Sequence, residues 1–319
     1  MQSFETLSAQ FSEKFDKRHF PHQPASLYEP NEYFLKLGGK RIRPVLCLMG
    51  NELFDEIIPD AWHAATAIEL FHNFTLIHDD IMDKAPLRRG KQTVHTRYNE
   101  STALLAGDVM MVKAYEYLNK ISSSHLHKVL SLFNKTAIEV CEGQQMDMDY
   151  ESRDDVSMND YLRMIELKTS VALAASLKIG GLLGGGGERN QNLLYEFGRK
   201  LGIAFQVQDD YLDAFGDQQK TGKQSGGDIL ANKKTFLLIH ALESASHQKE
   251  LKKLIRSDTA DKVKKVLEVY KDCKADEWAL QLKNKYFEEA VNHLEDIAVL
   301  SKRKEPLKEL ARFLLRRDY

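Results

Sequence analysis

The sequence predicts a mostly α-helical protein, on three observations. Long segments repeat apolar residues at helical spacing. Only seven prolines occur among the 319 residues, so few positions would break a helix. The segments between the periodic stretches lack the alternation of β-branched residues that is typical of strands, and no strand–helix–strand rhythm is present. We therefore expect an all-α fold.

The helices can be placed one after another by their periodicity. We expect them over residues 61–83, 102–121, 125–149, 158–183, 190–216 and 230–245. The loops predicted between them contain Gly or Pro and are short, at residues 38–39, 86–90, 184–187 and 222–227. Residues 246–319 are charge-rich and amphipathic, as expected of outer helices. Because no linker interrupts this series, residues 1–319 are predicted to form a single domain.

Composition excludes several classes of protein. The chain has 45 Lys and Arg against 47 Asp and Glu, a net charge of −2, which argues against a strongly basic nucleic-acid-binding face. Cys47, Cys141 and Cys273 lie far apart, so neither a disulfide framework nor a zinc site is indicated. The N-terminus lacks the apolar core of a signal peptide, and no stretch of about 18 apolar residues is present. We expect a cytoplasmic protein.

One short pattern occurs twice, as DDIMD at Asp79, Asp80 and Asp83 and as DDYLD at Asp209, Asp210 and Asp213. On a helix, positions i, i+1 and i+4 lie within an arc of roughly 100°, so each triplet clusters three carboxylates on one side. Such a cluster among apolar residues needs a compensating charge. Magnesium, which prefers oxygen ligands and commonly bridges carboxylates to phosphate oxygens, is the natural candidate.

Basic residues are placed as if to bind the phosphate groups. GGKRIRP puts Lys40, Arg41 and Arg43 directly after two glycines, and Arg88 and Arg89 follow the first triplet. Arg is suited to a bidentate grip on phosphate, and Lys to a point-charge contact. Further candidates are Lys168, Lys223 and Lys233. The string Gly184–Gly187 lacks the ending of a phosphate-binding loop and follows a predicted helix, so we interpret it as a helix-ending loop.

In this order, GGKRIRPVL, HNFTLIHDDIMD, RRG, KTS, FQVQDDYLD, TGK and NKK resemble the trans-prenyl diphosphate synthase (polyprenyl synthetase) family over residues 38–234. The resemblance implies a single-domain antiparallel helical barrel of the isoprenoid synthase class I type around a deep central cavity, usually a homodimer. It also implies an enzyme that uses Mg²⁺, with several ions at each active site, to condense isopentenyl diphosphate with allylic diphosphates.

The resemblance also implies roles for single residues. The two triplets would hold magnesium against the allylic diphosphate from opposite sides of the cavity mouth, with Asp79, Asp80, Asp83, Asp209, Lys168 and Lys223 central to catalysis. Other positions would bind that diphosphate: Arg88, Lys168, Thr169, Gln206, Lys223 and Lys233. A third set would hold isopentenyl diphosphate: Lys40, Arg43, His72 and Arg89. Gln144 and Asp147 match a further helix lining the pocket. Apart from the resemblance, Arg316 and Arg317 make the C-terminus basic, and it is either a solvated tail or a segment that closes over the bound diphosphate.

Product length depends, in this family, on bulky residues shortly before the first triplet. Those positions, four and five residues before Asp79, here hold Thr75 and Phe74, and a second aromatic, Phe71, lies about one turn further back. An ideal helical wheel favours Thr75 and Phe71 as lining residues, whereas the family precedent favours Phe74, and the sequence leaves that conflict open. With an aromatic within about two turns of the aspartates, we predict geranylgeranyl diphosphate (C20) as the main product and farnesyl diphosphate (C15) as the next.

Two other enzyme classes and one scaffold remain as alternatives. A class I terpene cyclase also uses a DDxxD motif but needs no second diphosphate site. A helical metal-dependent phosphohydrolase could use the adjacent His78 and Asp79 with His63 or His72, but leaves the second triplet unexplained. A non-catalytic subunit of a heteromeric synthase typically loses one aspartate motif, and this chain keeps both.

Overall fold

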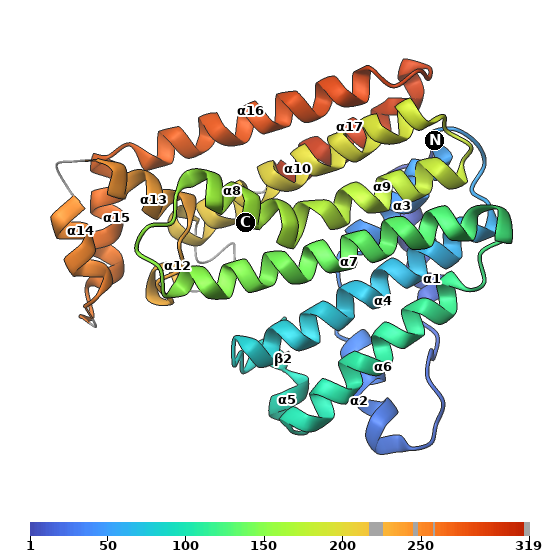
Figure 1. Ribbon diagram of the computed structural model, residues 1–319, viewed down its shortest axis with the longest axis horizontal. Helices are drawn as coiled ribbons and strands as arrows, with labels where there is room; N and C mark the ends of the chain where they lie inside the picture. The colour runs from blue at the N-terminus through green and yellow to red at the C-terminus, as the bar shows by residue number, and fades with distance from the viewer. Residues whose placement is uncertain (217–225, 245–247, 258, 316–319) are drawn as a thin grey trace. The chain divides into compact units, whose positions relative to one another are not determined.

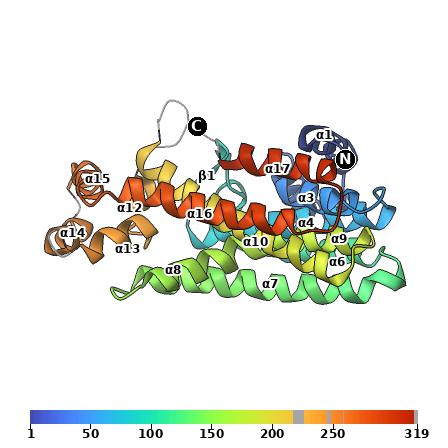
Figure 2. The same cartoon turned by 90° about the horizontal axis from the view of Figure 1, so that it is seen from above.

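The structure is a computed structural model that describes residues 1–216, 226–244, 248–257 and 259–315. Helices dominate this part of the chain (Figures 1 and 2). Contacts divide it into two compact units, one of Met1–Phe133 with Ser176–Asn192 and one of Asn134–Ala175 with Leu193–Tyr319. That residues 1–319 form a single domain stays a prediction.

The first unit is built mainly from the N-terminal helices. These are α1 (Phe4–Phe15), α2 (Ala25–Leu35), α3 (Ile42–Glu52), α4 (Pro59–Met82), α5 (Val94–Arg97) and α6 (Glu100–Leu118). Helix α4 packs on α6 along much of its length and also on α3. This close approach depends on a glycine, because a Cβ on Gly107 of α6 would lie 2.2 Å from Nε2 of His78 on α4. The C-terminal end of α4, which bears the first aspartate triplet, is thereby held against α6.

Three long helical segments belong partly to each unit. They are α7 (Ser123–Glu151), the run of α8 (Met158–Ile165), η1 (Glu166–Ser170) and α9 (Val171–Leu183), and α10 (Glu188–Phe215). The predicted loop at Gly184–Gly187 is confirmed as the end of α9. Gly185 has a φ of 78°, and the Gly186 amide donates to the Gly181 carbonyl at 2.8 Å, which is the bonding pattern of a Schellman C-cap.

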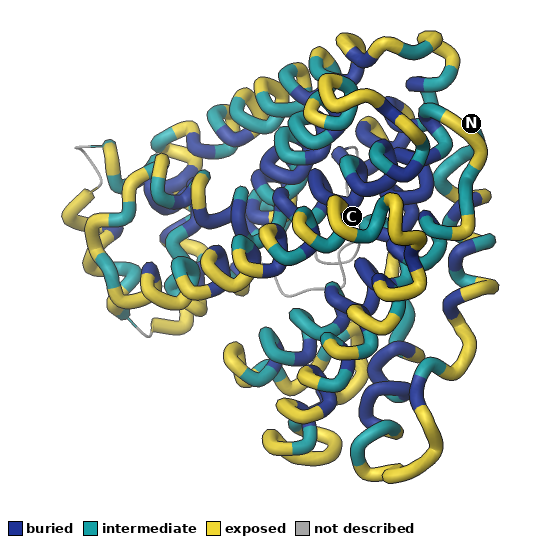
Figure 3. The backbone as a smooth tube through the Cα atoms, turned by 45° about the vertical axis from the view of Figure 1, so that its right-hand side comes forward, coloured by how far each residue is buried: buried dark blue, intermediate teal, exposed yellow. Residues whose placement is uncertain are grey.

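The second unit contains the C-terminal helices as well. They are α12 (Gly227–Leu230), α13 (Phe236–Glu243), α14 (Gln248–Ile255), α15 (Lys262–Asp272), α16 (Ala275–Glu295) and α17 (Ser301–Leu315). Helices α13, α14 and α15 pack on one another at the N-terminal end of α16 (Figures 1 and 2). Their inward residues, such as Phe236, Leu251 and Tyr270, form a buried core with Tyr161 and Val207. Figure 3 shows buried and exposed residues alternating along the helices, as expected of amphipathic segments.

The predicted helices are confirmed within a few residues, with three differences. Residues 158–183 form one run interrupted by the π-helical turn Glu166–Ser170. The helix expected over 230–245 begins only at Phe236, because Asn232 takes a left-handed conformation with a φ of 56°. The loop predicted at 86–90 contains a short hairpin, β1 (Leu87–Arg88) and β2 (Lys91–Gln92). Both residues at its turn have positive φ, 53° at Arg89 and 72° at Gly90, as a type I′ turn requires.

Within the described residues, no helix combines the length and the apolar composition needed to cross a membrane.

Candidate active site

The first triplet lies at the C-terminal end of α4, where Asp83 is the C-cap residue. The Asp80 side chain is 2% exposed. The Arg88 guanidinium neutralises it, with Nε donating to both carboxylate oxygens at 2.9 Å and Nη2 lying 2.8 Å from Oδ1. Burial raises the pKa of the Asp80 carboxyl, and the bonds from Arg88 oppose that rise. In this conformation, the arginine expected on the diphosphate is therefore bound to a member of the triplet.

The hairpin that contains Arg88 is fastened to the end of α4. The Thr93 hydroxyl donates to the Ala85 carbonyl at 2.8 Å, and the Thr93 amide donates to the Pro86 carbonyl at 3.2 Å. These two bonds close the segment from Ala85 to Thr93 into a compact loop. The loop places Arg88 beside Asp80, which lies eight residues earlier in the chain.

The residues expected to bind isopentenyl diphosphate gather at a second place in the first unit. Arg43 Nη1 donates to His72 Nε2 at 3.1 Å. Burial, followed by the positive charges of Arg43 and Arg89, holds the pKa of the His72 imidazole well below its usual range, so this ring is neutral. The Arg89 guanidinium lies against Gly39, where a Cβ would come within 3.0 Å of Nη2. Lys40, the residue after Gly39, is exposed beside this group.

Arg41 differs from Lys40 and Arg43. Its place in GGKRIRP suggested a phosphate-binding residue, but the structure pairs it with a carboxylate of the protein. Its side chain is 3% exposed and forms an ion pair with Glu69 of α4 at 2.5 Å. The Asn73 amide donates to the same Glu69 oxygen at 3.0 Å. A buried charge needs such partners because desolvation is costly. Arg41 thus anchors the start of α3 to α4, and this anchoring positions Lys40 and Arg43 on either side of it.

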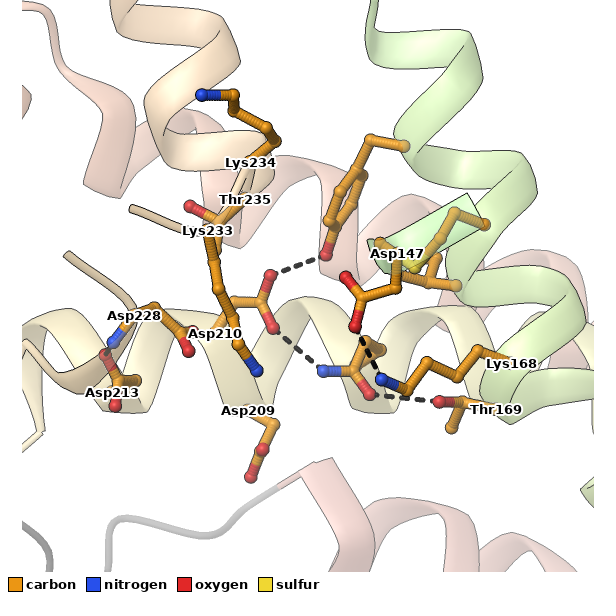
Figure 4. Close-up of a pocket in the computed structure, with 14 residues that line it drawn as sticks. Asp147, Lys168, Thr169, Asp209, Asp210, Asp213, Asp228, Lys233, Lys234 and Thr235 are labelled. Atoms are coloured by element: carbon orange, nitrogen blue, oxygen red, sulfur yellow. Dashed lines mark hydrogen bonds and ion pairs between the residues drawn. The ribbon is translucent and has the colours of Figure 1, made fainter. Parts of the chain in front are cut away.

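The second triplet lines a cavity of about 230 Å³ that lies wholly within the second unit (Figure 4). Asp210, which is 6% exposed, accepts bonds from the Tyr161 hydroxyl at 2.6 Å and from Gln206 Nε2 at 2.8 Å. Burial, with the nearby negative charge of Asp228, raises the pKa of Asp210 to about 8, although both hydrogen bonds oppose this shift. Asp209, by contrast, is exposed and points away from Asp210 in Figure 4.

Asp213 and Asp228 close one side of this cavity. The Asp228 amide donates to Asp213 Oδ2 at 3.0 Å, and the Gly226 amide donates to the Asp213 carbonyl at 2.7 Å. Sequence reasoning missed Asp228, as it also missed Tyr161 and Thr235, which line the same cavity. The sequence did contain an indication of Asp228, because it is an acidic residue in the glycine-rich segment that also contains Lys223 and Lys233. Tyr161 reads from sequence as an ordinary core aromatic.

Cationic and polar side chains face the same carboxylates. The π-helical turn Glu166–Ser170 presents Lys168 and Thr169 to the cavity, where Lys168 Nζ pairs with Asp147 at 2.5 Å and the Thr169 hydroxyl donates to Gln206 at 3.3 Å. π-Helical turns occur frequently at functional sites. Lys233 extends toward Asp210 in Figure 4. The structure therefore brings together the residues expected around the allylic diphosphate in this unit, except Lys223, which lies outside the described residues.

The remaining candidates have mixed outcomes. Asp147 lines the cavity, and Gln144 is buried one turn earlier on α7. Arg316 and Arg317 lie outside the described residues. His78 Nε2 lies 3.1 Å from the Leu104 carbonyl, and His72 Nε2 accepts a hydrogen bond from Arg43.

Aromatic rings precede the first triplet along α4. Phe71 is 6% exposed, and its ring centroid lies 5.9 Å from that of Phe74 and 5.3 Å from that of Phe133. Phe74 also contacts His78, at 4.7 Å between centroids. The Thr75 hydroxyl donates to the His72 carbonyl of its own helix at 2.8 Å. Phe71 and Phe74 therefore form the bulky part of this segment, and Thr75 contributes only a small side chain.

All these observations agree with one family. Residues 24–273 match the family model described as Polyprenyl synthetase, so the chain belongs to the polyprenyl synthetase family, whose members are prenyltransferases that make prenyl diphosphates. The family match and the named relatives support this enzyme class over the terpene cyclase, phosphohydrolase and scaffold alternatives.

Relatives and solved structures give the same result. The chain is 38% identical to "Geranylgeranyl pyrophosphate synthase" of Geoglobus acetivorans over 97% of this chain and 96% of the relative. It is 42% identical to "Short chain isoprenyl diphosphate synthase" of Methanocaldococcus jannaschii over 77% and 76% of the two chains. A crystal structure of a geranylgeranyl pyrophosphate synthase superposes with a TM-score of 0.95 at 40% identity and covers 99% of both chains. The predicted all-α isoprenoid synthase fold is confirmed.

Proposed function

We propose that this enzyme extends allylic diphosphates with isopentenyl diphosphate and releases mainly geranylgeranyl diphosphate. The observation that carries the proposal is the cavity in the second unit, where Asp209, Asp210 and Asp213 share one space with Lys168 and Lys233. Carboxylates and ammonium groups in one cavity suit a ligand that brings both bound cations and a multiply charged anion. A substrate diphosphate with its metal ions has that composition.

The donor set of this cavity fits magnesium. Asp209, Asp210, Asp213 and Asp228 supply oxygen ligands only, which is the chemistry that Mg²⁺ prefers. Among the residues that the structure describes, no three acidic, histidine or cysteine side chains are close enough together to hold an ion as they stand. We propose that these carboxylates turn toward the ions on binding, and that Asp79, Asp80 and Asp83 act likewise in the first unit. Magnesium bound there would neutralise charge on the departing diphosphate.

The chain's own residues complete the proposed chemistry. Cationic groups and neutral hydrogen-bond donors stabilise the negative charge that builds as the allylic carbon–oxygen bond ionises. We assign this role to Arg88, Lys168, Thr169, Gln206, Lys223 and Lys233. The double bond of isopentenyl diphosphate then attacks the carbocation, and a proton is lost to the released diphosphate. An apolar enclosure would keep water from the carbocation. Because the double bond of isopentenyl diphosphate is itself the nucleophile, no side-chain nucleophile is needed.

Isopentenyl diphosphate would bind at the other basic group, formed by Lys40, Arg43, His72 and Arg89. The Arg43–His72 bond supports this assignment, because it fixes the guanidinium and leaves the neutral ring with its Nδ1–H to donate. This second diphosphate does not leave during the reaction. It therefore needs positive charge for binding and no metal ions for ionisation.

Two observations support the C20 product. A relative named as a geranylgeranyl pyrophosphate synthase is 38% identical over nearly the whole chain. Phe71 and Phe74 also place two adjoining rings one to two turns before Asp79, where they would limit the growth of the product. With Thr75 hydrogen-bonded to its own helix, Phe74 is the residue we assign as the floor.

We propose a homodimer that forms through α6. Large apolar side chains lie on one face of this helix, with Leu104 51%, Leu105 55% and Val112 61% exposed and Tyr115 37% exposed. At helical spacing these positions fall within an arc of about 100°, which suits packing against the same stripe of a second copy. Size-exclusion chromatography with light scattering should give twice the chain mass, and Val112→Glu should reduce it to the monomer.

One assay tests the proposed activity. The purified chain is incubated with magnesium and labelled isopentenyl diphosphate, with or without geranyl or farnesyl diphosphate, and products are resolved by chain length. We expect incorporation only with an allylic primer and a main product of C20. Cyclised hydrocarbons from the primer alone would identify a terpene cyclase, and release of phosphate without chain growth would identify a hydrolase. Either result would overturn the proposal.

A further inference from the structure

A second cavity, of about 210 Å³, lies in the same unit between α13, α14 and the segment after α7. Its apolar wall comes from Val156, Ile239, Leu242 and Ile255. Its polar rim includes Lys234, Lys252 and Arg256. None of the aspartates of the two triplets lines it, so the proposed prenyl transfer leaves this cavity without a role.

The charges of the rim favour an anion. Arg256 pairs with Asp154 at 2.6 Å, and this pair is neutral as a whole. Lys234 and Lys252 form no ion pair with any other residue in the described part of the chain, and Glu151 is the remaining carboxylate of the lining. The positive charge of Lys234 and Lys252 thus exceeds the negative charge of Glu151, and the rim has a net positive charge. Lysine is a good point-charge partner for phosphate, which makes a phosphate group the natural head of a ligand.

Adjacent lysines serve the two cavities. Lys233 extends toward Asp210, whereas Lys234 points away from the aspartates (Figure 4). Lys234 lines both cavities. Asn232, the residue before the two lysines, lines only the second cavity. The left-handed Asn232 is fixed by Lys262, a lysine 3% exposed whose Nζ donates to Asn232 Oδ1 at 2.8 Å. This bond holds the turn from which Lys233 and Lys234 diverge.

The size of the cavity limits the rest of the ligand. Sites for drug-sized molecules span about 300–1,000 Å³, so this cavity suits a smaller molecule. A phosphate at the lysines leaves space for only a few carbon atoms against Ile239, Leu242 and Ile255. We propose that this cavity binds a small phosphate ester with a short apolar chain, as a site separate from the one lined by the aspartates.

Equilibrium binding of isoamyl phosphate tests this proposal, because its saturated chain cannot undergo prenyl transfer. The proposed isopentenyl diphosphate site also suits an alkyl phosphate, so every protein in this experiment carries Arg43→Ala to weaken that site. Calorimetry on this full chain should still give one site. Lys252→Ala should weaken binding about tenfold or more, as expected for the loss of a hydrogen bond between charged groups. Lys249→Ala, an exposed lysine on the same helix that does not line the cavity, is the matched control and should bind as the chain with Arg43→Ala alone does.

Two further arms locate the ligand. Leu242→Ser should weaken isoamyl phosphate but not inorganic phosphate, because only the ester has a chain to bury. Lys233→Ala, which alters the aspartate cavity, should leave the affinity unchanged. Unchanged affinity in Lys252→Ala, or a loss confined to Lys233→Ala, would overturn the proposal. Binding is measured without catalysis, so this result is independent of the prenyl-transfer assay.

Discussion

Arg88 and Asp80 form an ion pair in which a partly exposed guanidinium covers a carboxylate that is almost fully buried. The arginine is in the hairpin after α4, and the aspartate is in the last turn of α4. A diphosphate that binds Arg88 must therefore compete with Asp80. Metal ions on the carboxylate would offset the charge that Arg88 leaves behind.

Arg88→Ala should lower both stability and activity. Without the guanidinium, Asp80 is a buried charge lacking its main partner, which costs about 1–3 kcal/mol. Chemical denaturation should show this loss, and kcat/KM for the allylic substrate should also fall. Lys91→Ala, at an exposed position of the same hairpin, is the control and should change neither. Equal stability of the Arg88 and Lys91 variants would contradict the role of the pair.

The two triplets should act on one reaction. Asp79→Ala and Asp209→Ala should each remove several kcal/mol of transition-state stabilisation while the protein stays folded. If both carboxylates serve one ionisation, the double variant should lose less than the two single losses together. Steady-state kinetics at saturating magnesium measure this, with Asp149→Ala as an exposed control on α7. Near-normal turnover of either single variant would refute the assignment.

The two basic groups should separate in their kinetic effects. Arg43→Ala should mainly raise the KM for isopentenyl diphosphate, because it removes the partner of His72 in the first unit. Lys233→Ala should mainly raise the KM for the allylic diphosphate. Lys223→Ala should behave like Lys233→Ala if that residue reaches the same substrate. Equal changes of both constants in all three variants would argue against two distinct diphosphate sites.

Asp210 should make the stability of the metal-free chain depend on pH. Its folded-state pKa of about 8 exceeds the value of about 3.9 for an unfolded aspartate. The folded state thus holds the Asp210 proton more tightly than the unfolded state does. The contribution of this group to the free energy of unfolding is therefore fully present below about pH 4 and is lost as pH rises through about 8. With EDTA present, Asp210→Asn should flatten the fall in melting temperature over that range, and Asp149→Asn should not. Identical slopes in all three proteins would contradict the shift.

Phe74→Ala should lengthen the product. It removes the ring next to Phe71 and opens space before the first triplet. Product analysis by chain length should show a shift from C20 to longer chains. Thr75→Ala should leave the distribution as it is, because the Thr75 hydroxyl is turned to its own helix. An unchanged length in Phe74→Ala, or mainly C30 or longer products from the unmodified chain, would disprove the floor assignment.

Periodicity and motif spacing were sufficient for the helices and for the two aspartate triplets, because both depend on local sequence. Burial and pairing depend on distant residues, and there the sequence was a poorer guide. Arg41 and Arg43 look equivalent in GGKRIRP, yet Arg41 is buried on Glu69 and Arg43 reaches His72. Asp228 belongs to no repeated motif. Its place in the cavity becomes visible only in the structure, where its amide donates to the Asp213 carboxylate. The helix break at Asn232 depends on a left-handed backbone conformation at a residue that is not glycine, so no glycine in the sequence marks it.

The π-helical turn Glu166–Ser170 places one additional residue between α8 and α9. Such a turn contains one residue more than an α-helical turn but completes the same rotation, so the helices on either side of it keep their faces in phase. A deletion of one residue there would give a regular α-helix in which Tyr161 still faces Asp210. It would remove the widened backbone from which Lys168 and Thr169 extend into the cavity. The position of these two side chains thus depends on this single additional residue.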